Sequence, residues 1–560
     1  MGKLAAQARR NMAISTPLGK DVLLLETFTY NEEVARPFSM VAAVTSATPR
    51  SVDVEHLLGK PTTIRMMRKD RRKRYFNGIV SRVVQNQRIK DRPQYELTIV
   101  PKFWLLTRSS DCRIFQKKSV PQIVAEVFKE HNIDDSLSDR LKARYVKHDF
   151  LVQYRETSFN FLSRLMEMEG IYYYFEHTQQ GHQLVLADDT SCHRALPGYD
   201  QIPFHPRLDA PAPDRIFEWR GEAEITTAQV GMRAFDFKAP NTQPNGSKDL
   251  NIDGKVAGSE IFDYPVEFHI PADAGRFARL RAEELAANAK FYYAQTDCRG
   301  INVGGTFKLT DPIGQLRKSQ VRKYTVVGVS LSGAVTDYVS GNGIPGEEFT
   351  CAFRCIQASR VYRPPRSTPR PVVSGSQTAT VVGPAGDEIH TDKYGRVKLQ
   401  FHWDRHGKSD QDSSCWVRVS QPWAGKGFGG IQIPRIGQEI IVDFLEGDPD
   451  RPIIIGRVYN AGNMPPVSAA GRDASRNEVN PTNMIEAAMQ MTLRSNSLGG
   501  SGGHNEITMH DSGGAEKLFL KAQKDEVHLV QNDRKDTVLN DENREVVNNR
   551  TRKVGNNEKI

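Results

Sequence analysis

The end of the chain carries a valine repeat whose spacing limits the folds open to it. Between Ile507 and Ile560, apolar residues stand singly or in close pairs, and Asn, Asp, Glu, Arg, Lys and Thr fill the positions between them. Val538, Val546 and Val554 follow one another at intervals of eight residues. That period matches neither the heptad of a coiled coil nor the 3.6-residue turn of an α-helix. It is typical of a strand-and-turn repeat that points one valine inward per repeat.

A single copy of this repeat cannot form a stable core. Ordering the backbone costs about 1–2 kcal/mol per residue, whereas burying one valine returns only about 1.5–3 kcal/mol. The tail therefore predicts an intertwined homo-oligomer, in which several copies place their apolar side chains on a shared axis. The repeat still runs at Ile560, so we expect it to continue. The predicted needle-core residues are Val527, Leu529, Val538, Val546 and Val554.

The rest of the chain is long enough for about three to five domains. Residues 1–370 alternate strand patterns with helical ones, which predicts a mainly β hub of α+β character. Ser119 and Pro121 predict a helix start, Gly170 predicts the end of a second helix, and a third starts at Pro271. The proline-rich stretch 361–371 is typical of a stiff linker and marks the clearest boundary.

The remaining segments differ sharply in composition. Residues 371–465 hold short strand patterns spaced by Gly, Pro, Asp and Asn, which predict a small barrel such as an OB-fold. Residues 466–503 are rich in Gly, Ser, Ala and Asn and predict a linker. Residues 504–560 then form the start of the oligomeric tail.

Motifs for cofactor binding and thiol chemistry are weak. Gly425–Gly430 matches GxGxxG, but the strand pattern with Pro434 that follows leaves no helix N-terminus for a pyrophosphate. The six cysteines form no CxxC pair. Cys351 and Cys355 could bridge, although buried reduced thiols are the favoured interpretation.

Two clusters of polar side chains could have a function other than a structural one. A zinc site could be assembled from histidines and a cysteine, but turn residues among them favour surface or barrel-end histidines. A carboxylate cluster could serve a hydrolase, but it reads as a tight turn. We therefore predict no catalytic, cofactor-binding or metal-binding residues, no cofactor, and a protein that is not an enzyme. The two clusters are His390, His402, His406 and Cys415, and Asp443, Glu446, Asp448 and Asp450.

The charge pattern gives little support to nucleic-acid binding. A formal net charge of +9 is dilute over 560 residues. The run Arg65–Arg74 holds seven basic residues, but no aromatic residue interleaves with them as a stacking platform. We interpret it as a solvated hairpin tip; an acidic protein partner and nucleic acid are the alternatives. No apolar run is long enough to span a bilayer, and the N-terminus lacks the apolar region of a signal peptide.

Several long motifs, in the same order along the chain, resemble the VgrG family. These are the valine–glycine repeat spike proteins at the tip of bacterial type VI secretion systems, built like a phage tail hub fused to a spike. The resemblance covers nearly all of residues 20–560. It is carried by Phe76–Val80, Tyr154–Ser163, Glu169–Tyr173, Asp387–Asp404, Trp416–Ser420, Pro434–Glu439, Phe444–Pro452 and Gly456–Asn460.

The resemblance implies a structural, mechanical role. The protein would be a homotrimer whose hub of tail-hub barrels docks on the hexameric tube protein Hcp. The OB-fold barrel would form a neck, and the tail would start an intertwined triple-stranded β-helix. A PAAR-repeat tip protein, effectors or adaptors, and baseplate proteins would be further partners, and nucleic acid would not. The spike would wait in the bacterial cytoplasm and then be secreted or injected into a target cell.

Two departures from the family pattern bear on the alternatives. The phage counterpart carries a lysozyme domain between barrel and needle, but residues 460–503 are too few and too polar for one. The repeat contains a Val–Gly pair only at Val554–Gly555, so the start of the needle is irregular. A phage or prophage tail spike, and a spike with cell-wall hydrolase activity, are the alternative functions.

Replacing Val538, Val546 and Val554 with Asp should abolish the needle, because three carboxylates per chain would have to be buried on the shared axis. We expect the mass in solution, measured by light scattering, to fall and the thermal midpoint of unfolding to drop by several degrees. An unchanged thermal midpoint would contradict the shared core.

Overall fold

The computed structural model of the chain describes residue 7 and residues 10–89, 91–206, 214–242, 244–264, 273–335, 347–466, 488–500 and 502–556. These residues fall into two units, Met1–Val458 and Tyr459–Ile560. Most of the predicted linker, the expected helix start at Pro271 and the end of the repeat lie outside the described residues. Among the described residues, no helix combines the length and apolar character needed to cross a membrane.

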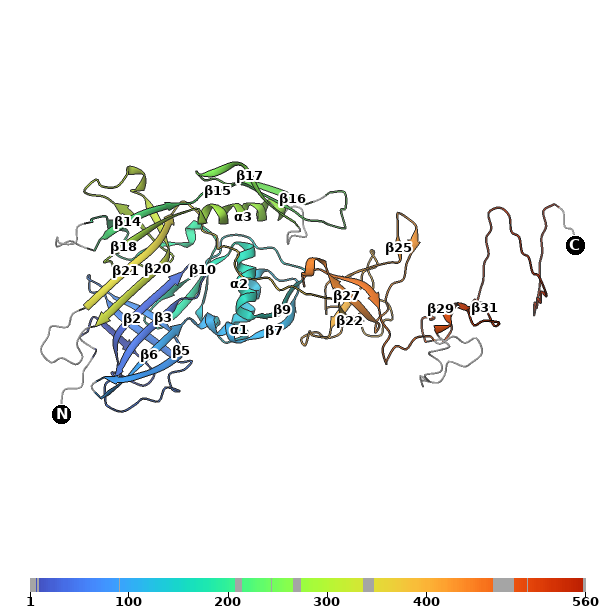
Figure 1. The fold of residues 1–560 in the computed structure, drawn as a ribbon, viewed down its shortest axis with the longest axis horizontal. Helices are drawn as coiled ribbons and strands as arrows, with labels where there is room; N and C mark the ends of the chain where they lie inside the picture. The colour runs from blue at the N-terminus through green and yellow to red at the C-terminus, as the bar shows by residue number, and fades with distance from the viewer. Residues whose placement is uncertain are drawn as a thin grey trace. The chain divides into compact units, whose positions relative to one another are not determined.

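Strands with one buried face build the large sheet of the first unit. In β4 (Pro61–Met67) and β6 (Arg92–Val100), every second residue is buried, as expected when one face lies on a core. The sheet has 13 strands, in the order β1-β4-β5-β6-β3-β2-β20-β21-β18-β14, with β12, β13 and β19 attached beside β20 (Figure 1). The other strands are β1 (Met12–Ser15), β2 (Leu23–Glu33), β3 (Ser39–Ser46), β5 (Lys73–Ile89), β12 (Arg194–Ala195), β13 (Gln201–Pro203), β14 (Ile216–Ala223), β18 (Lys290–Thr296), β19 (Gly305–Thr310), β20 (Lys323–Val335) and β21 (Glu347–Gln357).

Smaller elements complete the hub. The predicted helix start is confirmed, because Ser119 caps α1 (Val120–Glu130) with Pro121 in the first turn. The predicted end of α2 (Ser158–Glu169) is confirmed by Gly170, whose φ of 71° is left-handed. Other hub elements are β7 (Ser110–Phe115) paired with β9 (Leu151–Thr157), and the sheet of β8 (Leu137–Asp139), β10 (Tyr172–His177) and β11 (His182–Ala187). Helix α3 (Ala274–Asn288) packs on β15 (Thr226–Arg233) and β16 (Asn245–Asp249), whose sheet is completed by β17 (Lys255–Asp263).

The predicted barrel is confirmed as a five-stranded sheet. Its strands pair in the order β23-β22-β27-β28-β24, and a short hairpin, β25–β26, extends from it. Alternate residues of the strands, such as Ala379, Val381, Ile440 and Val442, are buried inside. The strands are β22 (Gln377–Val382), β23 (Lys398–Phe401), β24 (Arg418–Val419), β25 (Trp423–Ala424), β26 (Gly429–Gly430), β27 (Glu439–Phe444) and β28 (Pro452–Arg457).

The basic run forms the tip of the β4–β5 hairpin, as predicted. Three of its basic side chains, however, bind other parts of the hub instead of facing only solvent. Arg68 donates to the Pro197 carbonyl at 2.8 Å. Lys69 lies 2.8 Å from Asp214 and 2.9 Å from Asp297. Arg74 donates to the backbone of the second half of the hub, at the carbonyl of residue 299, at 2.9 Å. The run therefore ties the two halves of the hub together, because its partners lie far along the chain.

The proline-rich stretch 361–371 forms neither helix nor strand, and it is held on the hub. The buried Arg363 donates to the carbonyls of Gly170 and Asp188, both at 2.7 Å. The backbone N–H groups of Ser367 and Thr368 donate to the Glu167 carboxylate on α2. Residues 361–371 thus act as a strap, and the hub and the barrel belong to one unit.

Contacts from the hub also hold the barrel. The side chains of Phe150 and Val152 join the apolar core of the barrel, and the Val152 N–H donates to Asp450 at 2.6 Å. Phe237, from the β15–β16 connection, lies against Arg418 at 4.7 Å and Tyr394 at 5.4 Å. These apolar and cation–π contacts fix the barrel on the hub.

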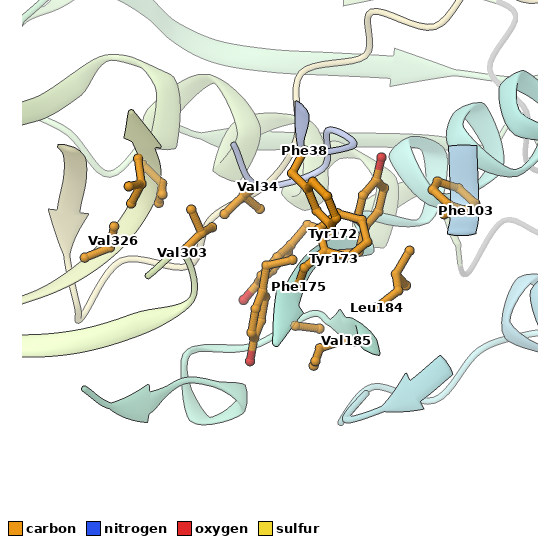
Figure 2. Close-up of a cluster of buried hydrophobic side chains, with 14 of the residues drawn as sticks. Val34, Phe38, Phe103, Tyr172, Tyr173, Phe175, Leu184, Val185, Val303 and Val326 are labelled. Atoms are coloured by element: carbon orange, nitrogen blue, oxygen red, sulfur yellow. The ribbon is translucent and has the colours of Figure 1, made fainter. Parts of the chain in front are cut away.

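Aromatic side chains form the centre of the hub core. Phe38 meets Phe175 edge-on with 4.9 Å between ring centroids, and Phe103 meets Tyr173 at 5.2 Å (Figure 2). Glu32 lies in the same core and is 2% exposed. Its carboxylate accepts from the Tyr30 hydroxyl at 2.6 Å and from the Phe175 N–H at 2.8 Å. Burial raises the pKa of Glu32 to about 7 despite these hydrogen bonds.

Replacing Glu32 with Gln should flatten the pH dependence of hub stability. The unfolded chain releases the Glu32 proton near pH 4.5, whereas the folded chain holds it to about pH 7. Native stability therefore falls between those values as pH rises, by about 1–3 kcal/mol. We expect the stability of the Gln variant relative to the native protein to rise over that window, measured by urea unfolding at pH 4.5 and 7.5. An equal difference at both pH values would contradict the assignment.

Candidate trimerisation interface

The second unit contains a small antiparallel sheet with an apolar face. Its strands are β29 (Gln490–Arg494), β30 (Glu506–His510) and β31 (Lys517–Lys521). β29 lies in the range predicted as a linker, so strand pairing starts before the predicted boundary at residue 504. The register aligns two apolar rows across the sheet, and their six side chains are between 42% and 62% exposed. The rows are Met491, Met509 and Leu518, and Leu493, Ile507 and Leu520.

Polar side chains occupy the buried face of the same sheet. Glu506 is 2% exposed and Thr508 is 1% exposed. The Thr508 hydroxyl donates to Glu506 at 2.8 Å, and His504 lies 3.3 Å from the same carboxylate. Apolar side chains outside and polar ones inside are the reverse of a sheet that is stable alone. The apolar face is therefore a candidate surface for contact with another chain.

Beyond β31, the described part of the chain forms no strand, and its apolar side chains are exposed. Val538, Val546 and Val554 are between 43% and 56% exposed. Val530 lies eight residues before Val538 and is 49% exposed, so it extends the eight-residue series of Val538, Val546 and Val554. The other predicted core residues and the apolar residues beside the series are far more exposed: Val527 is 88% exposed, Leu529 81%, Leu539 98% and Val547 86%.

Two of the four candidate zinc ligands, His406 and His390, have other partners. The His406 Nε2 lies 3.2 Å from Asp111, and the His390 ring packs on Trp416 with 4.9 Å between centroids. Within the described residues, no group of three or more metal-ligating side chains is brought together. Cys351 and Cys355 are free and buried.

The acidic cluster forms the turn predicted for it. Residues 445–447 make one short turn, and Glu446 has a φ of 57°. The Asp448 carboxylate accepts from the Asp450 N–H at 3.0 Å, while Asp450 accepts from Val152. These carboxylates therefore shape the connection and join the barrel to the hub.

A surface groove of about 470 Å³ crosses the large sheet from β2 to β14. Its lining includes the small residues Gly328, Ser330 and Ala352, and Ser330 pairs with Ala352 in the register of β20 and β21. Glu33 and Arg354 on its wall pair at 3.3 Å. The lining also includes Glu32, Glu218 and Arg220.

Three known domain families match successive parts of the chain. The phage tail baseplate hub family matches residues 31–336. The type VI secretion system/phage-baseplate injector OB domain matches residues 378–459. The C-terminal trimerisation domain of bacteriophage T4 gp5 matches residues 491–560, which include the apolar sheet face and the valine series. A mainly β hub, an OB-fold barrel and a trimerising tail define a hub-and-spike protein of the phage-tail class.

Whole-chain relatives narrow the class further. The chain is 41% identical over 529 residues to the type VI secretion system spike protein VgrG1b of Pseudomonas aeruginosa, a match covering 94% of this chain and 69% of that protein. It is 42% identical over 528 residues to VgrG1a of the same organism, covering 94% and 79%. The chain belongs to the VgrG family of spike proteins, which confirms the resemblance.

A solved structure shows the same fold. The E. coli c3393 protein, a type VI secretion component described as similar to the T4 tail proteins gp27 and gp5, matches 80% of this chain and 99% of its own chain. The TM-score is 0.56 and the identity is 21%.

Replacing Val530 with Asp should weaken trimer formation, whereas replacing Leu539 with Asp should not. Successive side chains of an extended strand point to opposite faces, so Leu539 points away when its neighbour Val538 points to the axis. We expect the Val530 variant to lose trimer mass on dilution and the Leu539 variant to match the native protein. Light scattering over a concentration series provides the measurement. Equal losses in the two variants would contradict the register.

Proposed function

We propose that three copies of this chain form the spike at the tip of a type VI secretion tube. The observation that carries the proposal is the apolar series on the last described residues, which the single chain leaves exposed and which coincides with the trimerisation match. Three intertwined copies would bury the valines and leave no open strand edge. Such a shaft concentrates the force of contraction on a small area of the target envelope.

The hub would dock on a hexameric Hcp-like tube. Three copies of a hub that matches the baseplate hub family would present a repeated surface that can adapt threefold to sixfold symmetry. Baseplate proteins would hold the hub before firing. A PAAR-repeat tip protein, and effectors or adaptors, would bind at the needle end.

The spike would work mechanically and not as an enzyme. It would wait in the bacterial cytoplasm and leave, or enter the target cell, when the tube is fired. The carboxylates that could have served a hydrolase shape a turn and a hub contact, which supports this interpretation. The hub and the barrel form one unit, which suits a protein that must transmit force from the tube to the needle.

A chromosomal variant with Val530, Val538, Val546 and Val554 replaced by Asp should stop secretion. We expect the Hcp-like tube protein in the culture medium to fall to the level of a strain lacking this gene, because an unfolded spike cannot cap the tube. The quantity of tube protein is measured in medium and in cells.

A matched variant provides the control for that experiment. Replacing Gln531, Leu539 and Val547, each the residue after a valine of the series, with Asp adds a similar charge at exposed positions and should leave secretion intact. Normal secretion by the valine variant would refute the spike role. Release of soluble fragments from peptidoglycan by the purified chain would instead favour the hydrolase alternative.

A further inference from the structure

The β25–β26 hairpin of the barrel presents apolar side chains to solvent. Residues 421–434 contain a single charged side chain, Lys426. Trp423 is 65% exposed, Phe428 60% and Ile431 75%. Figure 1 shows the hairpin extending away from the strands of the barrel. Exposed aromatic residues grouped in a segment of low charge are typical of an interface that is covered in the assembled protein.

The hairpin is held in one conformation. The rings of Trp423 and Phe428 meet edge-on with 5.4 Å between centroids. Trp423 pairs with Gly430 in the register, and the Gly425 N–H donates to the Phe428 carbonyl at 2.9 Å. Gly429 has a φ of 135°, and a side chain there would collide with the Trp423 carbonyl, so the GxGxxG stretch serves this tight turn. The aromatic pair is therefore presented on a preorganised support, which lowers the entropic cost of binding.

The base of the hairpin is anchored to the last strand of the barrel. The Ser420 N–H donates to the Ile454 carbonyl at 2.8 Å, and Arg457 donates to the Gln432 side chain at 3.3 Å. Ile455 lies between these anchors on β28 and is 48% exposed, whereas its neighbour Ile454 points into the core. We call Trp423, Phe428, Ile431 and Ile455 the neck patch.

The position of the neck patch in the chain indicates what covers it. β28 ends at Arg457, and the trimerisation match begins at residue 491, so three joined tails hold three barrels close together. Tethering raises the effective concentration of one barrel around the next to about the millimolar range. At such a concentration, weak apolar contacts between barrels form. The low charge also suits burial between subunits, since few charged groups would have to lose their water there.

We propose that the neck patch packs against the barrel of a neighbouring copy, forming a second ring of contacts between subunits ahead of the trimerising tail. The inference rests on the proposed trimer. In a threefold ring each barrel gives its hairpin to the next, so head-to-tail contacts close on themselves. The Trp and Phe side chains would supply the anchors, as aromatic residues do at protein interfaces.

Photo-crosslinking of the purified full chain tests the contact directly. Phe428 is replaced by p-benzoylphenylalanine, and Ile225, which is 71% exposed on the hub, carries the same replacement as the matched control. After irradiation we expect covalent dimers and trimers on a denaturing gel from the Phe428 variant, several-fold above the control. A yield no higher than that of the control, from protein that light scattering shows to be trimeric, overturns the neck contact alone.

Oxidation of Trp423 by hydroxyl radicals provides a second readout that leaves the patch unaltered. We expect Trp423 to react several-fold more slowly in the native trimer than in the variant with Asp at the four valines of the tail. Equal rates in trimer and monomer overturn the proposal. A native chain that is itself monomeric at micromolar concentration overturns the proposed trimer, which separates the two failures.

Discussion

Burial of apolar side chains between copies of the chain is the interaction on which the rest of the molecule depends. The tail leaves its valines open to solvent, and the β29–β31 sheet turns its apolar face outward while Glu506 and Thr508 lie inside. Neither arrangement is stable for a lone chain in water. Assembly would therefore be part of folding for this end of the protein.

The hub and the barrel differ from the tail, because their hydrophobic cores are formed within a single chain. The basic hairpin tip binds Asp214 and Asp297, Arg363 fastens the proline-rich strap, and Phe237 reaches the barrel. A part that receives force from a contracting tube and passes it to a shaft benefits from such cross-connections. Each one joins segments that are distant in sequence, so local unfolding of one segment is resisted by the others.

Local chemistry predicted much of the fold. Ser119, Pro121 and Gly170 marked helix ends correctly, because capping depends on neighbouring backbone groups. The barrel and the oligomeric tail also followed from spacing. The partners of Arg68 and Lys69, and the packing of Arg363, could not be predicted, because they lie more than a hundred residues away. The place of Val530 in the same eight-residue series stays a prediction.

The sequence by itself determined that this protein is a mainly β hub, barrel and tail whose end must associate with copies of itself. That conclusion needs only the spacing of valines and the free energy available from burying them. Only the tertiary structure decided which apolar residues remain exposed, including the sheet face around Ile507 and the hairpin around Trp423. Exposure depends on which distant segments cover a side chain, and the pattern of one strand does not contain that information.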